Sequence, residues 1–80
     1  MVLSKEEIKK YLPHRDPFLF VDEVVEFKES GYIKAMSTFD KNSYFFQGHF
    51  PGNPVVPGVI ILEAMAQVGG VLIYKSFEDD

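Results

Sequence analysis

The sequence predicts a small α+β fold, because two strand-like segments flank a short polar turn and one long apolar helix follows them. Residues 18–27 and 32–39 are rich in aromatic and β-branched side chains, which are typical of β-strands. The polar residues 28–30 separate the two segments and indicate a hairpin. The run over residues 59–74 is apolar on nearly every side, as expected for a buried core helix. The predicted order is therefore a hairpin followed by a helix.

Local signals define the ends of these elements. Gly31 is expected to supply the left-handed backbone position at the hairpin tip. Ser4 and Glu7 form a capping-box pattern that predicts a short N-terminal helix. Its apolar residues continue at helical spacing to Leu12, and Pro13 then ends it.

Size and composition exclude several classes of protein. Eighty residues, with no repeat and no linker, are expected to form one domain over residues 1–80. The net charge of −4 argues against a nucleic-acid binder, which needs a basic face. The absence of cysteine excludes disulfides and thiolate metal sites and suits a reducing cytoplasm. We expect no signal peptide and no membrane span, because the apolar run is shorter than about 20 residues and polar side chains interrupt it.

One continuous stretch, residues 48–67, contains the best candidates for chemistry. Glu63 lies on the apolar helix, where burying an unpaired carboxylate would cost several kcal/mol, so we expect a neutral acid or a charged partner. Gln67 lies one turn further along the same face. His49 precedes the helix in a loop stiffened by Gly and Pro, and Gly58 opens the helix with a free backbone N–H. Together they offer a base, an oxyanion donor and an acid.

Three motifs resemble one enzyme family. They are Leu-Pro-His-Arg at residues 12–15, Pro-Phe-Leu-Phe-Val-Asp at 17–22 and, above all, the stretch from residue 45 to 67 with Gly-His-Phe-Pro-Gly and Leu-Glu-Ala-Met-Ala-Gln. They are similar to the (3R)-hydroxyacyl-acyl carrier protein dehydratases of bacterial fatty-acid synthesis, which have the hot-dog fold. That resemblance implies an antiparallel sheet wrapped around the central helix.

The resemblance also implies roles for individual residues. His49 and Glu63 would be the catalytic base and acid, with the acid supplied by the neighbouring subunit of a homodimer or larger homo-oligomer. Gly58 would donate its backbone N–H to the thioester carbonyl. Glu63, where a sister family of isomerising enzymes has Asp, favours a plain dehydratase. The expected substrate-tunnel residues are Phe46, Phe50, Pro57 and Gln67. No cofactor and no metal are expected, and acyl carrier protein would be the partner.

Other polar residues are interpreted as structural. His14 is more simply a locally hydrogen-bonded histidine than a functional one. Asp22 and Glu23 point to opposite faces of a strand and predict a turn or solvent contact rather than an acid–base pair. The family usually has an aromatic residue where Asp16 stands, so the packing at that position is open. Lys9, Lys10 and Arg15 are scattered candidates for docking the acidic carrier.

Two other functions stay open. Only two strands precede the helix and none follows it, so the domain is expected to be truncated after the central helix. An isolated chain of this length is expected to be poorly folded or inactive, with an apolar helix face and a sheet edge uncovered. A non-catalytic hot-dog remnant that serves in assembly or binding is therefore one alternative. A hot-dog acyl thioesterase is the other.

Overall fold

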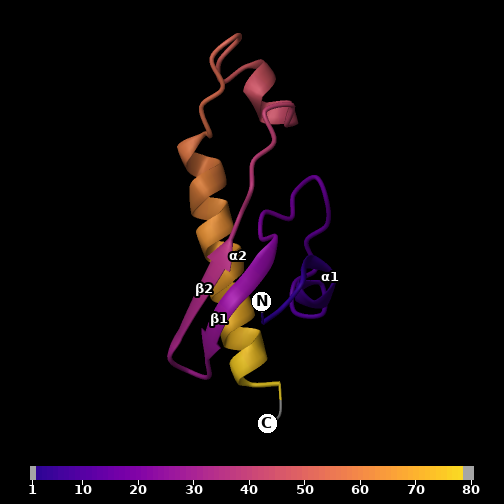
Figure 1. Cartoon of the computed structure of the whole chain (residues 1–80), viewed down its shortest axis with the longest axis vertical. Helices are drawn as coiled ribbons and strands as arrows, with labels where there is room; N and C mark the ends of the chain where they lie inside the picture. Colours follow the sequence, from indigo (N-terminus) through magenta and orange to yellow (C-terminus); the bar gives the residue numbers. More distant parts are fainter. Residues whose placement is uncertain (1, 79–80) are drawn as a thin grey trace.

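A helix and a hairpin make up most of the computed structural model, which describes residues 2–78 (Figure 1). The elements are α1 (Lys5–Ile8), β1 (Glu23–Lys28), β2 (Tyr32–Met36), the 3-10 helix η1 (Tyr44–Gln47) and α2 (Gly58–Ser76). The hairpin lies along α2, whereas the loop that carries η1 projects beyond the start of α2 (Figure 1). The molecule is consequently elongated, at 47 × 20 × 19 Å. The predicted order of hairpin and helix is confirmed.

The hairpin is antiparallel, and both strands are shorter than predicted. Val24 lies opposite Ala35 and Phe27 opposite Ile33, with an irregularity between Val24 and Glu26. Residues 18–22 precede β1. The side chain of Gln67 holds the backbone of residues 18 and 20, and the N–H of Asp22 donates to the backbone oxygen of Met36 at the end of β2. Beyond β2, the backbone N–H of Thr38 donates to the Asp22 carboxylate at 2.6 Å. These contacts agree with the interpretation of Asp22 as a structural residue rather than part of an acid–base pair.

The tip of the hairpin differs from the prediction in which residue takes the left-handed backbone. Ser30 has φ of 52°, whereas Gly31 is not in that region. The N–H of Ser30 donates to the hydroxyl of Ser76 at 2.8 Å, which ties the tip to the end of α2. Gly31 is required for space, since a Cβ there would lie 2.9 Å from Cγ of Lys28. The glycine thus makes room for a side chain while a serine accepts the unusual dihedral angle.

Substitution of Ser30 tests this assignment. Ser30→Val is expected to destabilise the protein by about 1–2 kcal/mol, because a β-branched side chain fits the left-handed region poorly. Ser30→Asn should stay within about 0.5 kcal/mol of the parent, because asparagine tolerates that region. The free energy of unfolding in urea measures both. Equal stability of the two variants would contradict the assignment.

The N-terminal segment forms the predicted capping box but a shorter helix. The N–H of Glu7 donates to Oγ of Ser4 at 3.2 Å, and the N–H of Ser4 donates to Oε1 of Glu7 at 3.0 Å. The α-helix ends at Ile8 rather than at Leu12, and a turn continues it. Leu3 forms an isolated bridge with Val24, so the segment also lines up along β1. Apolar burial of Ile8 and Leu12 stabilises this turn against the sheet.

Two apolar clusters form the core. The larger joins the N-terminal segment and the hairpin to the second half of α2 and consists of Leu3, Ile8, Leu12, Leu19, Val21, Val24 and Val71. The smaller consists of Phe20, Ile60 and Ala64. Each cluster includes one face of α2 only. The core therefore positions α2 firmly along that face.

The opposite face of α2 is exposed, which agrees with the uncovered apolar helix face expected for a chain of this length and not with a helix buried on every side. Val59 is 71% exposed and Leu62 is 66% exposed. The physical reason is that a two-stranded hairpin is too narrow to cover both faces. At 19 residues, α2 is long and apolar enough to cross a membrane, judged by length and composition alone. The sequence analysis expects the apolar run to be too short for a membrane span. This is weak evidence, because core helices of soluble proteins pass the same test.

Gly70 allows a close approach to α2. A Cβ at Gly70 would lie 3.2 Å from Cδ2 of Leu12, whereas a Cβ at Gly69 would meet nothing within 4 Å of the described atoms. The close approach is therefore made at Gly70 and not at Gly69. It seats the N-terminal segment, and the loop that follows Leu12, directly on α2.

Candidate active site

His49 is held by its own loop. Its Nδ1 lies 2.8 Å from the backbone oxygen of Val55, and its ring stacks on Phe50 with centroids 4.1 Å apart. Reciprocal backbone hydrogen bonds between Phe50 and Asn53 close the turn, and Gly52 takes φ of 73° there. Because a carbonyl oxygen can only accept, Nδ1 carries the hydrogen and Nε2 keeps a free lone pair. The loop therefore fixes the orientation of a half-buried imidazole.

The start of α2 supplies backbone donors. Pro57 is the N-cap residue and makes no side-chain capping bond. The N–H groups of Ile60 and Ile61 both donate to the backbone oxygen of Pro57. Those of Gly58 and Val59 donate to no described backbone oxygen, so they are available for a ligand. No described atom lies within 4 Å of where a Gly58 Cβ would be, so the space beside that residue is open. This geometry suits an oxyanion that develops beside the helix start.

Glu63 is held by two polar side chains. Its Oε2 accepts a hydrogen bond from Nε2 of Gln67 at 2.9 Å and lies 3.5 Å from Nε2 of His14. The Glu63 side chain is 31% exposed, so it is less buried than predicted. Its two neighbours are the neutral amide of Gln67 and the imidazole of His14, so the expectation of a neutral acid or a charged partner stays a prediction. The exposure arises because one side of α2 is uncovered.

Gln67 is the most deeply buried polar residue in this site, at 2% exposure. Its Oε1 accepts from the N–H of Phe20 at 2.8 Å, and its Nε2 donates to the backbone oxygen of Phe18 at 2.9 Å as well as to Glu63. Predicted as a tunnel residue, Gln67 thus joins residues 18–20 to α2 and orients Glu63.

His14 is the residue whose part in the site the sequence interpretation missed. It was treated as a local structural histidine, whereas its ring faces Glu63 across 49 positions of sequence. The signal that was present is its Leu-Pro-His-Arg setting, where Pro13 stops the helix and turns the chain. No periodicity connects residues 14 and 63, and they are brought together by the packing of Leu12 against Gly70 and by the bonds of Gln67 to residues 18 and 20.

Within residues 2–78, no hydrogen bond or ion pair joins His49 to Glu63. His49 belongs to the loop that projects past the start of α2, and Glu63 lies in the second turn of that helix. His49 and Glu63 are therefore positioned independently of each other. Within one chain they do not form a site by direct contact.

The other predicted tunnel residues lie around the same loop. Phe46 and Phe50 line one hollow of about 370 Å³, in which Phe46 is buried and Phe50 is 48% exposed. Pro57 is half-buried at the end of the loop and lines none of the described hollows. Their assignment to an acyl tunnel stays a prediction.

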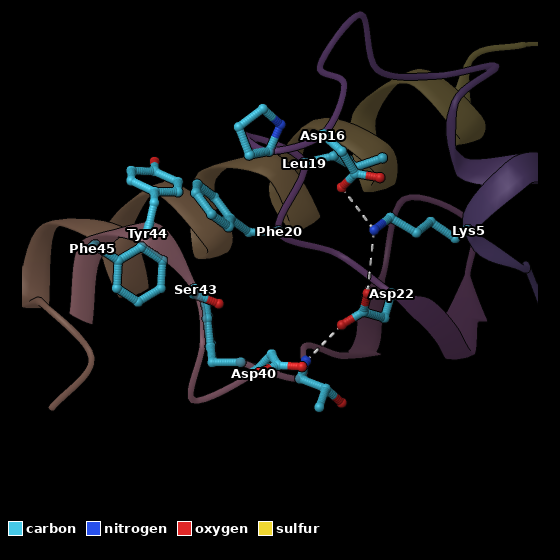
Figure 2. Close-up of a pocket in the computed structure, with 12 residues that line it drawn as sticks. Lys5, Asp16, Leu19, Phe20, Asp22, Asp40, Ser43, Tyr44 and Phe45 are labelled. Atoms are coloured by element: carbon cyan, nitrogen blue, oxygen red, sulfur yellow. Dashed lines mark hydrogen bonds and ion pairs between the residues drawn. The ribbon is translucent and has the colours of Figure 1, made fainter. Parts of the chain in front are cut away.

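A separate hollow of about 480 Å³ lies beside Asp16 (Figure 2). Lys5 joins Asp16 at 2.9 Å and Asp22 at 3.6 Å, as the dashed lines in Figure 2 show. The hydrogen bond from Lys5 lowers the pKa of Asp16, and the same bond raises the pKa of Lys5. Asp16 thus points to solvent and pairs with α1. None of the predicted site residues lines this hollow.

Comparisons with known proteins agree on one family. Residues 12–80 match the family model of the FabA-like domain. The chain is 60% identical over 74 residues to the 3-hydroxyacyl-[acyl-carrier-protein] dehydratase FabZ of Erwinia tasmaniensis. It is 55% identical over 74 residues to the protein of the same name from Salmonella arizonae. Each alignment covers 92% of this chain and 49% of the relative, so the chain spans about half the length of the curated relatives it matches.

These matches confirm the fold expected from the resemblance. The α2 helix and the antiparallel pair β1–β2 are the parts of a hot-dog fold that the described residues contain. With most of its length covered by the family model, the chain belongs to the family of FabA-like domains.

Proposed function

We propose that the protein containing this chain dehydrates a (3R)-3-hydroxyacyl thioester on acyl carrier protein to the trans-2-enoyl thioester. The observation that carries the proposal is the constellation of His49, Gly58 and Glu63, each held by separate contacts in a FabA-like domain. The similarity to proteins named 3-hydroxyacyl-[acyl-carrier-protein] dehydratase supports the substrate class.

The proposed reaction divides its protons between two groups. Nε2 of His49 accepts the proton from C2, because Nδ1 is engaged with Val55. The C2 electron pair forms the double bond to C3 as the C3–O bond breaks, and Glu63 in its acid form protonates the departing hydroxyl to water. The N–H of Gly58 donates to the thioester oxygen while negative charge builds there. Overall, one hydroxyacyl thioester gives one enoyl thioester and one water molecule.

A second subunit is part of the proposal. The resemblance implies that the acid of each site comes from the neighbouring chain, and the separation of His49 from Glu63 in one chain is consistent with that arrangement. The exposed face of α2 around Val59 and Leu62 offers apolar surface for further protein to cover. We place the protein in the cytoplasm as a homodimer or larger homo-oligomer, without a membrane span.

The carrier is the proposed macromolecular partner, and no nucleic acid is. Of the three candidate docking residues, Lys9 pairs with Glu6 at 2.9 Å, and Arg15 donates to the backbone oxygens of residues 12 and 14. Lys10 is exposed. The described residues therefore supply little of a basic docking surface themselves, and the remaining half of the relatives' length is where more of it is expected.

The test uses a chimera in which this chain replaces the matched half of the Erwinia tasmaniensis relative. With a trans-2-enoyl thioester, hydration is followed as loss of the enoyl ultraviolet absorbance, and hydrolysis is followed in parallel as release of free thiol. We expect absorbance loss without thiol release. Thiol release would instead identify an acyl thioesterase.

The exposed apolar face of α2 around Val59 and Leu62 is the observation that favours a second candidate, a non-catalytic hot-dog protein with a role in assembly or binding. The 80-residue chain, assayed beside the chimera, distinguishes the two cases. An active chimera and an inactive chain are expected if the sequence retains catalytic competence but needs the rest of the fold. A folded chimera with neither reaction would support the non-catalytic protein.

A further inference from the structure

The loop at residues 12–15 packs on α2 through Leu12 and is braced internally by Arg15. Leu12 is buried in the larger core cluster and approaches Gly70. Nη1 of Arg15 donates to the backbone oxygen of Leu12 at 2.8 Å and to that of His14 at 2.7 Å. These contacts define the backbone from which the imidazole of His14 projects. The ring is therefore placed beside Glu63 by packing rather than by its own mobility.

The proton on the His14 ring follows from its surroundings. Nε2 lies 3.5 Å from Oε2 of Glu63, whereas Nδ1 is buried and has no hydrogen-bond partner within residues 2–78. A lone pair on Nε2 would face the carboxylate oxygen and repel it, and a second hydrogen on Nδ1 would be an unpaired buried donor. The neutral ring with hydrogen on Nε2 satisfies both constraints.

We propose that His14 is a positioning residue for Glu63, presenting an Nε2–H to the same carboxylate oxygen that Gln67 already binds. The separation of 3.5 Å is longer than a well-formed hydrogen bond, and catalytic contacts of this length commonly tighten when substrate binds. With Oε2 engaged by two donors, Oε1 is left for the substrate. After Glu63 gives up its proton, the same donors stabilise the carboxylate. This inference rests on the proposed function, since it assigns His14 a part in the acid step.

Two variants in the chimera separate positioning from packing. His14→Phe keeps a planar ring and removes both nitrogens, and is expected to lower kcat at least tenfold while KM stays within twofold. His14→Gln places an amide donor near the position of Nε2 and is expected to recover most of the lost kcat. Parental kcat in the Phe variant, or equal losses in the Phe and Gln variants, would overturn the proposal.

A spectroscopic measurement on the unmodified ring keeps the test independent of activity and of how His14→Phe folds. The ¹⁵N spectrum of the chimera should show His14 with hydrogen on Nε2 and none on Nδ1. Its signals should move in Glu63→Gln and stay in place in Glu26→Gln, a matched change at a carboxylate on the hairpin. Hydrogen on Nδ1, or indifference to Glu63→Gln, would overturn the contact. If the parent chimera did not hydrate the enoyl thioester, the proposed function would be rejected. The ¹⁵N spectrum would still show whether His14 contacts Glu63.

Discussion

Replacing His49 by alanine is expected to lower the hydration rate of the chimera by about 10²–10⁴-fold, the range that a positioned general base contributes. The reason is that residues 48–57 contain no other imidazole and no carboxylate, and the bond of His49 to Val55 leaves its Nε2 free. The initial rate of absorbance loss, measured at saturating enoyl thioester, gives the effect on kcat.

Glu63→Gln is expected to have an effect of the same order, because the amide keeps the shape of the side chain and cannot give up a proton as a carboxylic acid does. Glu26→Gln is the control, since Glu26 contacts the exposed Tyr32 and Lys34 on the hairpin and should leave the rate unchanged. Activity near the parental rate in either the His49 or the Glu63 variant would remove that residue from the proposed mechanism.

Gln67→Leu is expected to destabilise the chimera by about 2–4 kcal/mol. Leucine has a similar size but leaves the N–H of Phe20 and the oxygen of Phe18 without their partner, and each unsatisfied buried group costs about 1–3 kcal/mol. Urea unfolding measures the change in free energy.

Gln47→Leu is the matched control, because Gln47 is exposed at the end of η1. Its effect is expected to stay within about 0.5 kcal/mol, as for most surface substitutions. If the two leucine variants had equal stability, the Gln67 amide would not be what holds residues 18–20 on α2.

Local patterns were sufficient for much of the fold. The capping box at Ser4 is a contact between residues three positions apart, and the structure forms it. The long apolar run after Gly58 likewise forms one helix. It contains no proline, and its two interior glycines do not end it. Boundaries were less accurate where a distant side chain competed for the backbone, as Gln67 does for residues 18 and 20.

The candidate site shows the same division. His49, Gly58 and Glu63 could be identified from residue type and spacing, since a stiffened loop, a helix start and a carboxylate on an apolar helix are visible in the sequence. Their geometry could not, because the contact of Glu63 with His14 depends on two segments that pack through Leu12 and Gly70. Exposure of Glu63 could not be foreseen either, since it depends on how much of α2 the hairpin covers.

By itself, the sequence determined the order of hairpin and helix, the stiff loop around His49 and the chemical groups available to the site. The tertiary structure decided that Ser30 rather than Gly31 takes the left-handed backbone, and that His14 lies beside Glu63. The physical reason is range: propensity and capping act between neighbours along the chain, whereas burial and side-chain pairing depend on which distant segments pack together.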